Sequence, residues 1–260
     1  MKIWIIADLH EDIIRTKEAI KLLKDNNCEK TVCLWDLVWV AIPYYWYMKS
    51  RNWSEVIKLV KEHCDVVVVW NHDLYCIKKN PQSSKFKYPV NWYSLDYQTR
   101  NSLANWDLWL MEENELSAII SDEEKKYISS LPEYKIIEYD GIKILFSHWI
   151  YPEFTWTTKF KAETLEDYDA LFDFMKQYDC KINIVWHSHR RRYFFSEKWL
   201  LDLNFNIKFK LGSNFWWFVI PCVANWTEQN WVAIFDTKSL EIEFLPLNTK
   251  PHIVPERAKL

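Results

Sequence analysis

Histidine, aspartate and asparagine side chains follow five short apolar segments of this chain, each time where the segment ends. The five polar groups are Asp8-Leu9-His10, Trp35-Asp36, Trp70-Asn71-His72-Asp73, Ser147-His148 and Trp186-His187-Ser188-His189. They contain five of the 7 histidines. Carboxylates, imidazoles and amide oxygens together suit divalent metals such as Mn, Fe, Zn or Ni. The sequence therefore indicates a metal site that is assembled from several strand ends.

The spacing inside the polar groups supports a shared site. Asp8 and His10 are two residues apart, as are His187 and His189, so each pair can point to one side of an extended segment. The candidate ligands are Asp8, His10, Asp36, Asn71, His148, His187 and His189. With Asp36 shared, this set suits two ions about 3.5–4 Å apart, a pair that activates a bridging hydroxide for in-line attack at phosphorus.

The elements that must position these groups alternate between strand and helix. Strands are predicted over 2–7, 31–34 and 65–69, and amphipathic helices over 13–23 and 54–63. Such an order implies parallel strands joined by right-handed crossovers. Ligands of open α/β sheets bind beyond the carboxyl ends of the strands, where the polar groups lie.

The rest of the chain predicts further strands and helices of one α/β domain over 1–260. They are a helix that begins with the capping box at Ser121, strands over 134–139 and 142–146 around Asp140-Gly141, a helix over 163–178, a strand over 182–185, and a C-terminal hairpin of 232–235 with 242–245. The segment 74–131 is polar and aromatic before it becomes helical. We expect it to form a cap-like insertion beside the site.

Composition excludes several classes of protein. The chain of 260 residues is 49% hydrophobic and 27% charged, with a formal net charge of -3. These values exclude a disordered chain, a collagen-like chain and a strongly basic nucleic-acid-binding protein. No apolar run approaches the roughly 20 residues that span a bilayer, and the first apolar run reads as a strand and not as a signal peptide. A cytoplasmic protein with reduced thiols and no membrane partner is expected.

Taken together, the five polar groups resemble the motifs of the calcineurin-like metallophosphoesterases. The family pattern is D-x-H, G-D-x-x-G, G-N-H-[DE], a lone H and G-H-x-H, and the corresponding groups here span residues 8–189. The resemblance implies a four-layer α/β/β/α sandwich of two mixed sheets. It also implies two divalent metal ions, manganese among the candidates, and a small phosphate ester or a nucleotide as the substrate.

The resemblance assigns a role to each matching residue. One ion would be held by Asp8, His10, Asp36 and His189, and the other by Asp36, Asn71, His148 and His187. His72 would hydrogen-bond a phosphoryl oxygen or protonate the leaving group, and Asp73 would orient it.

The sequence departs from the family at its glycines. There are 2 glycines and 17 tryptophans, whereas an average usage of about 7% would give about 18 glycines. Positions 35, 39, 70 and 186 are tryptophan where the family has glycine, and Trp4 and Trp149 resemble further cases. Glycine suits these turns because a side chain would crowd the metals, or because φ is positive, which strains other residues by about 1–3 kcal/mol. An alternative hypothesis is therefore a non-catalytic metal-binding or scaffold module of the same fold.

The residues around the second motif indicate the class of substrate. Family members that act on phosphoproteins or dinucleoside tetraphosphates carry Asp-Arg-Gly shortly after this motif, where Trp39-Val40-Ala41 stands here. A phosphodiesterase is therefore favoured. Arg190 and Arg191 could clamp a second phosphate, although a solvated charge run is the favoured interpretation. The aromatic run 44–47 resembles a base-stacking platform, but a nucleic-acid partner is disfavoured and the oligomeric state stays open.

Overall fold

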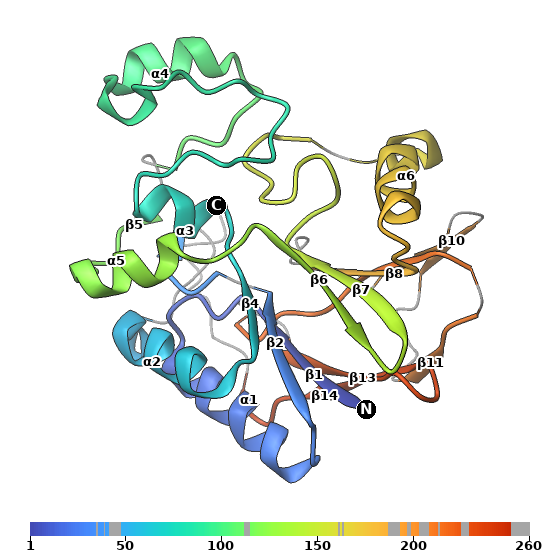
Figure 1. The fold of residues 1–260 in the computed structure, drawn as a ribbon. Helices are drawn as coiled ribbons and strands as arrows, with labels where there is room; N and C mark the ends of the chain where they lie inside the picture. Colours follow the sequence, from blue (N-terminus) through green and yellow to red (C-terminus); the bar gives the residue numbers. More distant parts are fainter. Residues whose placement is uncertain are drawn as a thin grey trace.

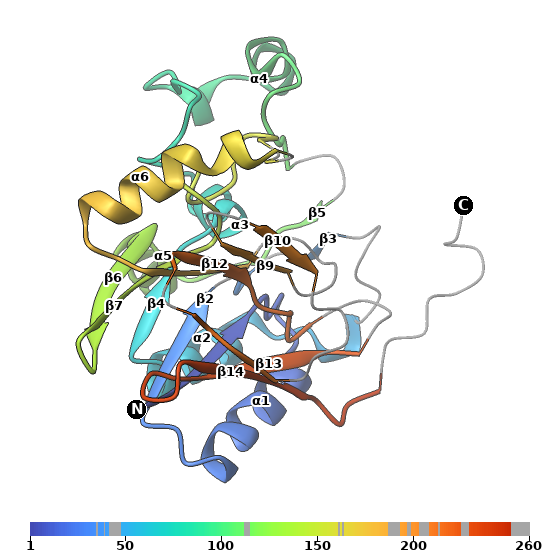
Figure 2. The same cartoon turned by 90° about the vertical axis from the view of Figure 1, so that its right-hand side faces the viewer.

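Two six-stranded mixed sheets form the centre of the molecule. The computed structural model describes residues 1–34, 36–38, 40–41, 48–111, 115–160, 162, 164–186, 193–196, 199–202, 208–212, 214–224 and 229–250. The sheets pack face to face with helices outside them, as the two views show (Figures 1 and 2). The expected four-layer α/β/β/α arrangement is therefore confirmed.

The first sheet carries the N-terminal strands. Its order is β11 (Lys208–Lys210), β14 (Glu241–Pro246), β13 (Trp231–Asp236), β1 (Lys2–Ala7), β2 (Lys30–Leu34) and β4 (Val66–Val68). β1, β2 and β4 are parallel, and the others pair antiparallel. Helices α1 (Ile13–Asp25) and α2 (Trp53–His63) cover its outer face (Figure 1). The predicted strands and helices of this half are confirmed, with small shifts at their ends.

The second sheet carries His148 and Trp186 at its strand ends. Its order is β10 (Trp199–Asp202), β9 (Tyr193–Ser196), β12 (Trp216–Val219), β8 (Ile182–Val185), β7 (Ile142–Ser147) and β6 (Tyr134–Tyr139). β7, β8 and β12 are parallel. Asp140 and Gly141 both have positive φ, 50° and 77°, which suits the tight turn of the predicted β6–β7 hairpin.

Helix α6 (Asp169–Gln177) covers the outer face of the second sheet (Figure 2). It begins later than the predicted helix over 163–178, because a 3-10 turn, η3 (Leu165–Tyr168), precedes it. Thr164 caps that turn: its backbone N–H donates to Asp167 Oδ2 at 2.8 Å. This cap therefore starts a separate 3-10 turn before α6, although the apolar pattern of the sequence runs through both elements.

Alternating side chains of the second sheet serve two cores. On β7, Ile144 and Phe146 join the large core between the sheets, whereas Leu145 joins the core under α6. This period of two is what a strand buried on both faces requires. The large core fixes the sheets to each other, so the strand ends of both sheets are held at fixed positions.

The remaining elements lie between and beyond the sheets. They are β3 (Val40–Ala41), which pairs with β5 (Glu115–Leu116), η1 (Met48–Ser50), α3 (Asn71–Cys76), η2 (Trp92–Ser94), α4 (Tyr97–Ala104) and α5 (Asp122–Ser129). The capping box at Ser121 is present as predicted. α4 stands apart from the sheets (Figure 1), and its segment has a small apolar cluster of its own around Trp92 and Leu108.

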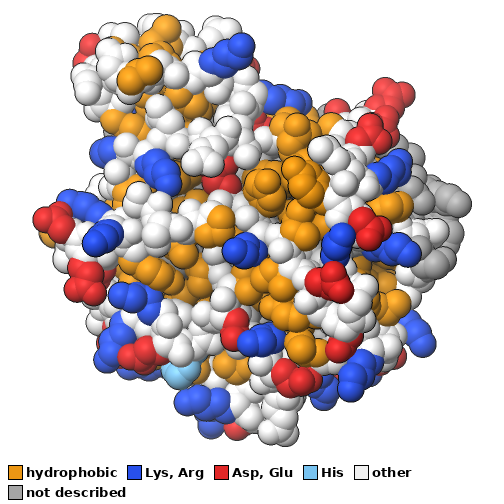
Figure 3. All heavy atoms as spheres, viewed as in Figure 1, with side chains coloured by type: hydrophobic (Ala, Val, Ile, Leu, Met, Phe, Trp, Pro, Cys, Tyr) orange, Lys and Arg blue, Asp and Glu red, His pale blue; other side chains and the backbone are white. Residues whose placement is uncertain are grey.

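The described surface mixes charges of both signs. On the face seen in Figure 3, lysine and arginine side chains alternate with aspartate and glutamate over the sheets and the lower helices. Among the described helices, none is long and apolar enough to cross a membrane.

Candidate metal centre

The loops that follow β1, β2 and β4 meet at one edge of the first sheet. Backbone N–H groups of Leu9 and His10 donate to the carbonyl oxygen of Asp36 at 3.1 and 2.8 Å, and Glu11 N–H donates to Leu37 at 3.0 Å. This network holds the first and second motifs in register. It forms because β1 and β2 are parallel neighbours whose carboxyl ends coincide.

Asp8, His10 and Asp36 form a buried cluster at this edge. Their ligating atoms lie within 4.8 Å of one another, and His10 Nε2 lies 3.3 Å from both Asp8 Oδ2 and Asp36 Oδ2. Asp8 and His10 have φ of 50° and 40°, a region that residues other than glycine seldom adopt. Such strain persists only where the surroundings fix it and is typical of functional sites. The loop conformation thus directs a carboxylate and an imidazole toward Asp36.

The charges around the cluster favour a cation. The next two acids along the chain have arginine partners, since Glu11 pairs with Arg51 and Asp12 with Arg15. Asp8 Oδ1, in contrast, is buried and has no hydrogen-bond partner among the residues that the structure describes. Burial, with a smaller effect of the charge on Asp73, raises the pKa of Asp8 well above its usual value. A cation beside Asp8 would supply the missing partner and favour the carboxylate form. The residues therefore fit one divalent ion.

Helix α3 presents the third motif to the cluster. His72 Nε2 lies 3.8 Å from Asp36 Oδ2, and its side chain is 14% exposed while that of Asp36 is fully buried. Asn71 Oδ1 accepts the His72 backbone N–H at 2.9 Å, and Asn71 Nδ2 donates to the Trp156 carbonyl at 3.1 Å. His72 therefore lies on the solvent side of the cluster, and Asn71 is committed to backbone contacts.

The Asp73 side chain is buried on the side of α3 that faces away from solvent. Its Oδ1 accepts backbone N–H groups of Leu37 and Val38, both at 3.3 Å. Burial raises the pKa of Asp73, and the backbone hydrogen bonds oppose that rise. This position gives Asp73 a role in holding the loop that carries Asp36. Its expected role of orienting His72 stays a prediction.

Asp73→Ala is expected to lower the free energy of unfolding by about 1–3 kcal/mol, because it leaves two buried N–H groups without their acceptor. Urea unfolding of the variant measures this loss. Asp173→Ala, at a side chain that is 79% exposed, is the matched control and should change stability little. Equal stability of the two variants would contradict the role in the loop.

The structure describes three of the second set of candidate ligands, Asp36, Asn71 and His148, and an indole lies against His148. His148 is fully buried, and the indole of Trp70 stacks on its imidazole with ring centroids 3.5 Å apart and planes at 29°. Trp70 has an extended backbone with φ of -126°, and Trp186 is not among the residues with positive φ. Tryptophan at positions 70 and 186 therefore crowds the neighbouring side chains but does not strain the backbone.

Comparison with known proteins assigns the chain to a family. The family model of the calcineurin-like phosphoesterases matches residues 1–193. The chain belongs to this family. The fold of this chain is also similar to that of solved structures. A metallophosphoesterase from Sphaerobacter thermophilus has a TM-score of 0.64 at 17% identity, over 95% of this chain and 88% of that one. A hypothetical protein from Pyrococcus horikoshii has a TM-score of 0.55 at 12% identity, over 99% and 90%. No curated protein sequence matches the chain.

Several predicted site residues of this chain lie outside the described residues. They are His187, His189, Arg190 and Arg191, together with Trp35, Trp39 and the aromatic run 44–47. Their roles stay predictions.

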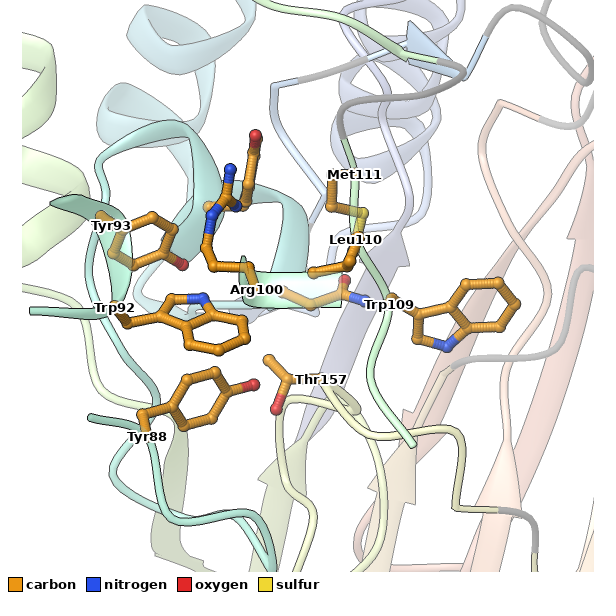
Figure 4. A pocket seen from close by; sticks show the side chains of 10 residues that line it. Tyr88, Trp92, Tyr93, Arg100, Trp109, Leu110, Met111 and Thr157 are labelled. Carbon is orange, nitrogen blue, oxygen red and sulfur yellow. The ribbon is translucent and has the colours of Figure 1, made fainter. Parts of the chain in front are cut away.

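A small aromatic pocket beside Asn71 has no counterpart in the sequence motifs. Tyr88, Trp92 and Tyr93 line it together with Arg100, and Thr157 closes it from the loop after β7 (Figure 4). Arg100 is buried, and its Nε donates to the Leu95 carbonyl at 3.2 Å. Most of the lining comes from the segment 74–131. No periodic pattern marks these residues, so sequence reasoning could not single them out.

Proposed function

We propose that this chain is a metal-dependent phosphoesterase that acts on phosphodiesters. The observation that carries the proposal is the buried cluster of Asp8, His10 and Asp36, in which Asp8 Oδ1 has no hydrogen-bond partner among the described residues. Burying a carboxylate oxygen without a partner lowers the stability of the fold, and apolar side chains at these positions would be more stable. The cluster is therefore explained better by binding of a cation than by stability.

The proposed roles of the residues combine the burial of the described ones with the family resemblance. Asp8, His10 and Asp36 would hold a divalent ion, and His189 would complete its ligands. A divalent ion supplies Lewis-acid chemistry and a nucleophile derived from water when it is bound. His72, on the solvent side, would donate a hydrogen bond to a phosphoryl oxygen or a proton to the leaving oxygen.

The segment 74–131 would form a cap beside the site and set the choice of substrate. Its aromatic side chains and Arg100 line the pocket that adjoins Asn71. The absence of Asp-Arg-Gly after the second motif favours diesters, since Trp39-Val40-Ala41 stands there.

Hydrolysis of bis-p-nitrophenyl phosphate is expected to exceed that of p-nitrophenyl phosphate in the presence of Mn²⁺ or Ni²⁺. The two esters share a leaving group, so the comparison isolates the preference for a diester. The assay should include a variant with glycine at positions 35, 39, 70 and 186, the family's glycine positions. Absence of turnover of both esters by both proteins would refute the proposed activity.

A specific observation favours a second candidate function. Because the Trp70 indole covers His148, the chain could be a metal-binding or scaffold module that does not turn over. Metal bound by a well-folded chain, with no hydrolysis by the chain itself, would support this candidate.

A further inference from the structure

The indole of Trp70 lies among the candidate metal ligands without being one. Its ring centroid is 3.5 Å from that of His148, 5.0 Å from that of His72 and 6.2 Å from that of His10. The side chain is 2% exposed. One buried indole therefore packs against His148, which follows β7 of the second sheet, and lies close to His10 and His72, which follow β1 and β4 of the first.

This placement sets a limit on metal binding. An imidazole nitrogen must approach a bound ion to about 2.0–2.1 Å, as zinc sites show. For Asp36 to share an ion with His148, both side chains would have to reach one point. The indole that stacks on His148 also packs against His10 and His72, whose Nε2 atoms lie 3.3 and 3.8 Å from Asp36 Oδ2. An ion and its ligands cannot occupy space that an indole already fills.

We propose that Trp70 closes the second metal position, so that the chain as it stands binds one divalent ion, held by Asp8, His10 and Asp36. Glycine at position 70 would remove the indole and free His148 to bind a second ion. The inference deepens the proposed function, on whose metal assignment it rests.

Metal stoichiometry tests the inference without an activity assay. Each protein is loaded with Mn²⁺, freed of excess metal and analysed for bound manganese. The unmodified chain should hold about one equivalent and Trp70→Gly about two. Mn²⁺ paramagnetic resonance should change from the signal of an isolated ion to that of a coupled pair.

Three control variants separate the proposed effect from general loosening. Trp70→Phe keeps a ring over His148 and should retain the stoichiometry of the unmodified chain. Trp70→Gly with His148→Ala should return to that value. Trp217→Gly removes another buried indole, whose ring neighbours Trp149 and Tyr168 belong to the core under α6, and should leave the stoichiometry unchanged.

Two results would overturn the inference, and a third would separate it from the proposed activity. A coupled pair of ions in the unmodified chain would overturn the inference, and this measurement needs no variant to fold. A folded Trp70→Gly protein, checked by circular dichroism, that still holds only one ion would also overturn it. If the stoichiometries follow the expectation but no ester is hydrolysed, the inference stands and the proposed activity fails.

Discussion

Replacing His72 with alanine is expected to reduce the hydrolysis rate of an alkyl diester by about 10²–10⁴-fold, the usual contribution of a general acid. Bound metal should not change, because His72 lies outside the cluster of Asp8, His10 and Asp36 and on its solvent side. A nitrophenyl diester should lose less, since nitrophenolate needs little protonation to leave. Rates for both esters and manganese content of the same preparation measure these effects.

Two outcomes would revise the role of His72. Loss of metal from His72→Ala would make this residue a ligand. An equal loss of rate on both esters would indicate stabilisation of a phosphoryl oxygen and not proton donation. His63→Ala, in α2, is the matched control for removal of a histidine and should leave both rates unchanged.

Asp36→Asn is expected to weaken Mn²⁺ binding by at least about 100-fold, since even residues that only support metal ligands contribute about 10–100-fold. The change keeps the size of the side chain and leaves the backbone carbonyl that accepts from Leu9 and His10. It removes the negative charge that lies 3.3 Å from His10 and 3.8 Å from His72. Hydrolysis should fall in proportion to the bound metal.

Titration calorimetry with Mn²⁺ measures the affinity, and circular dichroism checks the fold. Asp173→Asn removes one negative charge at an exposed position and should bind metal as the unmodified chain does. Unchanged affinity of Asp36→Asn would show that the metal site lies elsewhere.

The sheets could be predicted because short-range patterns determine them. The apolar runs over 2–7 and 182–185 predicted buried strands, and Asp140-Gly141 predicted a tight turn. The rule that ligands lie beyond parallel strand ends then brought Asp8, His10 and Asp36 to one edge.

Contacts that depend on distant backbone could not be predicted. α3 is too short to show a helical period, so the direction of Asp73 toward the loop after β2 had no sequence signal. The stacking of Trp70 on His148 depends on how two sheets face each other. The family resemblance indicated that tryptophan stands at position 70 where the family has glycine, but only the packing showed which imidazole the indole covers.

The linked loops at the edge of the first sheet also restrict how this fold can diversify in evolution. The loop after β1 donates backbone hydrogen bonds to Asp36 and Leu37, and the loop after β2 donates to Asp73. A length change in either loop would displace donors and acceptors of all three strand ends at once. The described stretch 78–111, before β5, bonds instead to side chains outside these three loops, among them Glu133 and Glu153. Inherited changes in chain length should therefore accumulate there, so that a lineage can acquire new substrates while the cluster of Asp8, His10 and Asp36 stays constant.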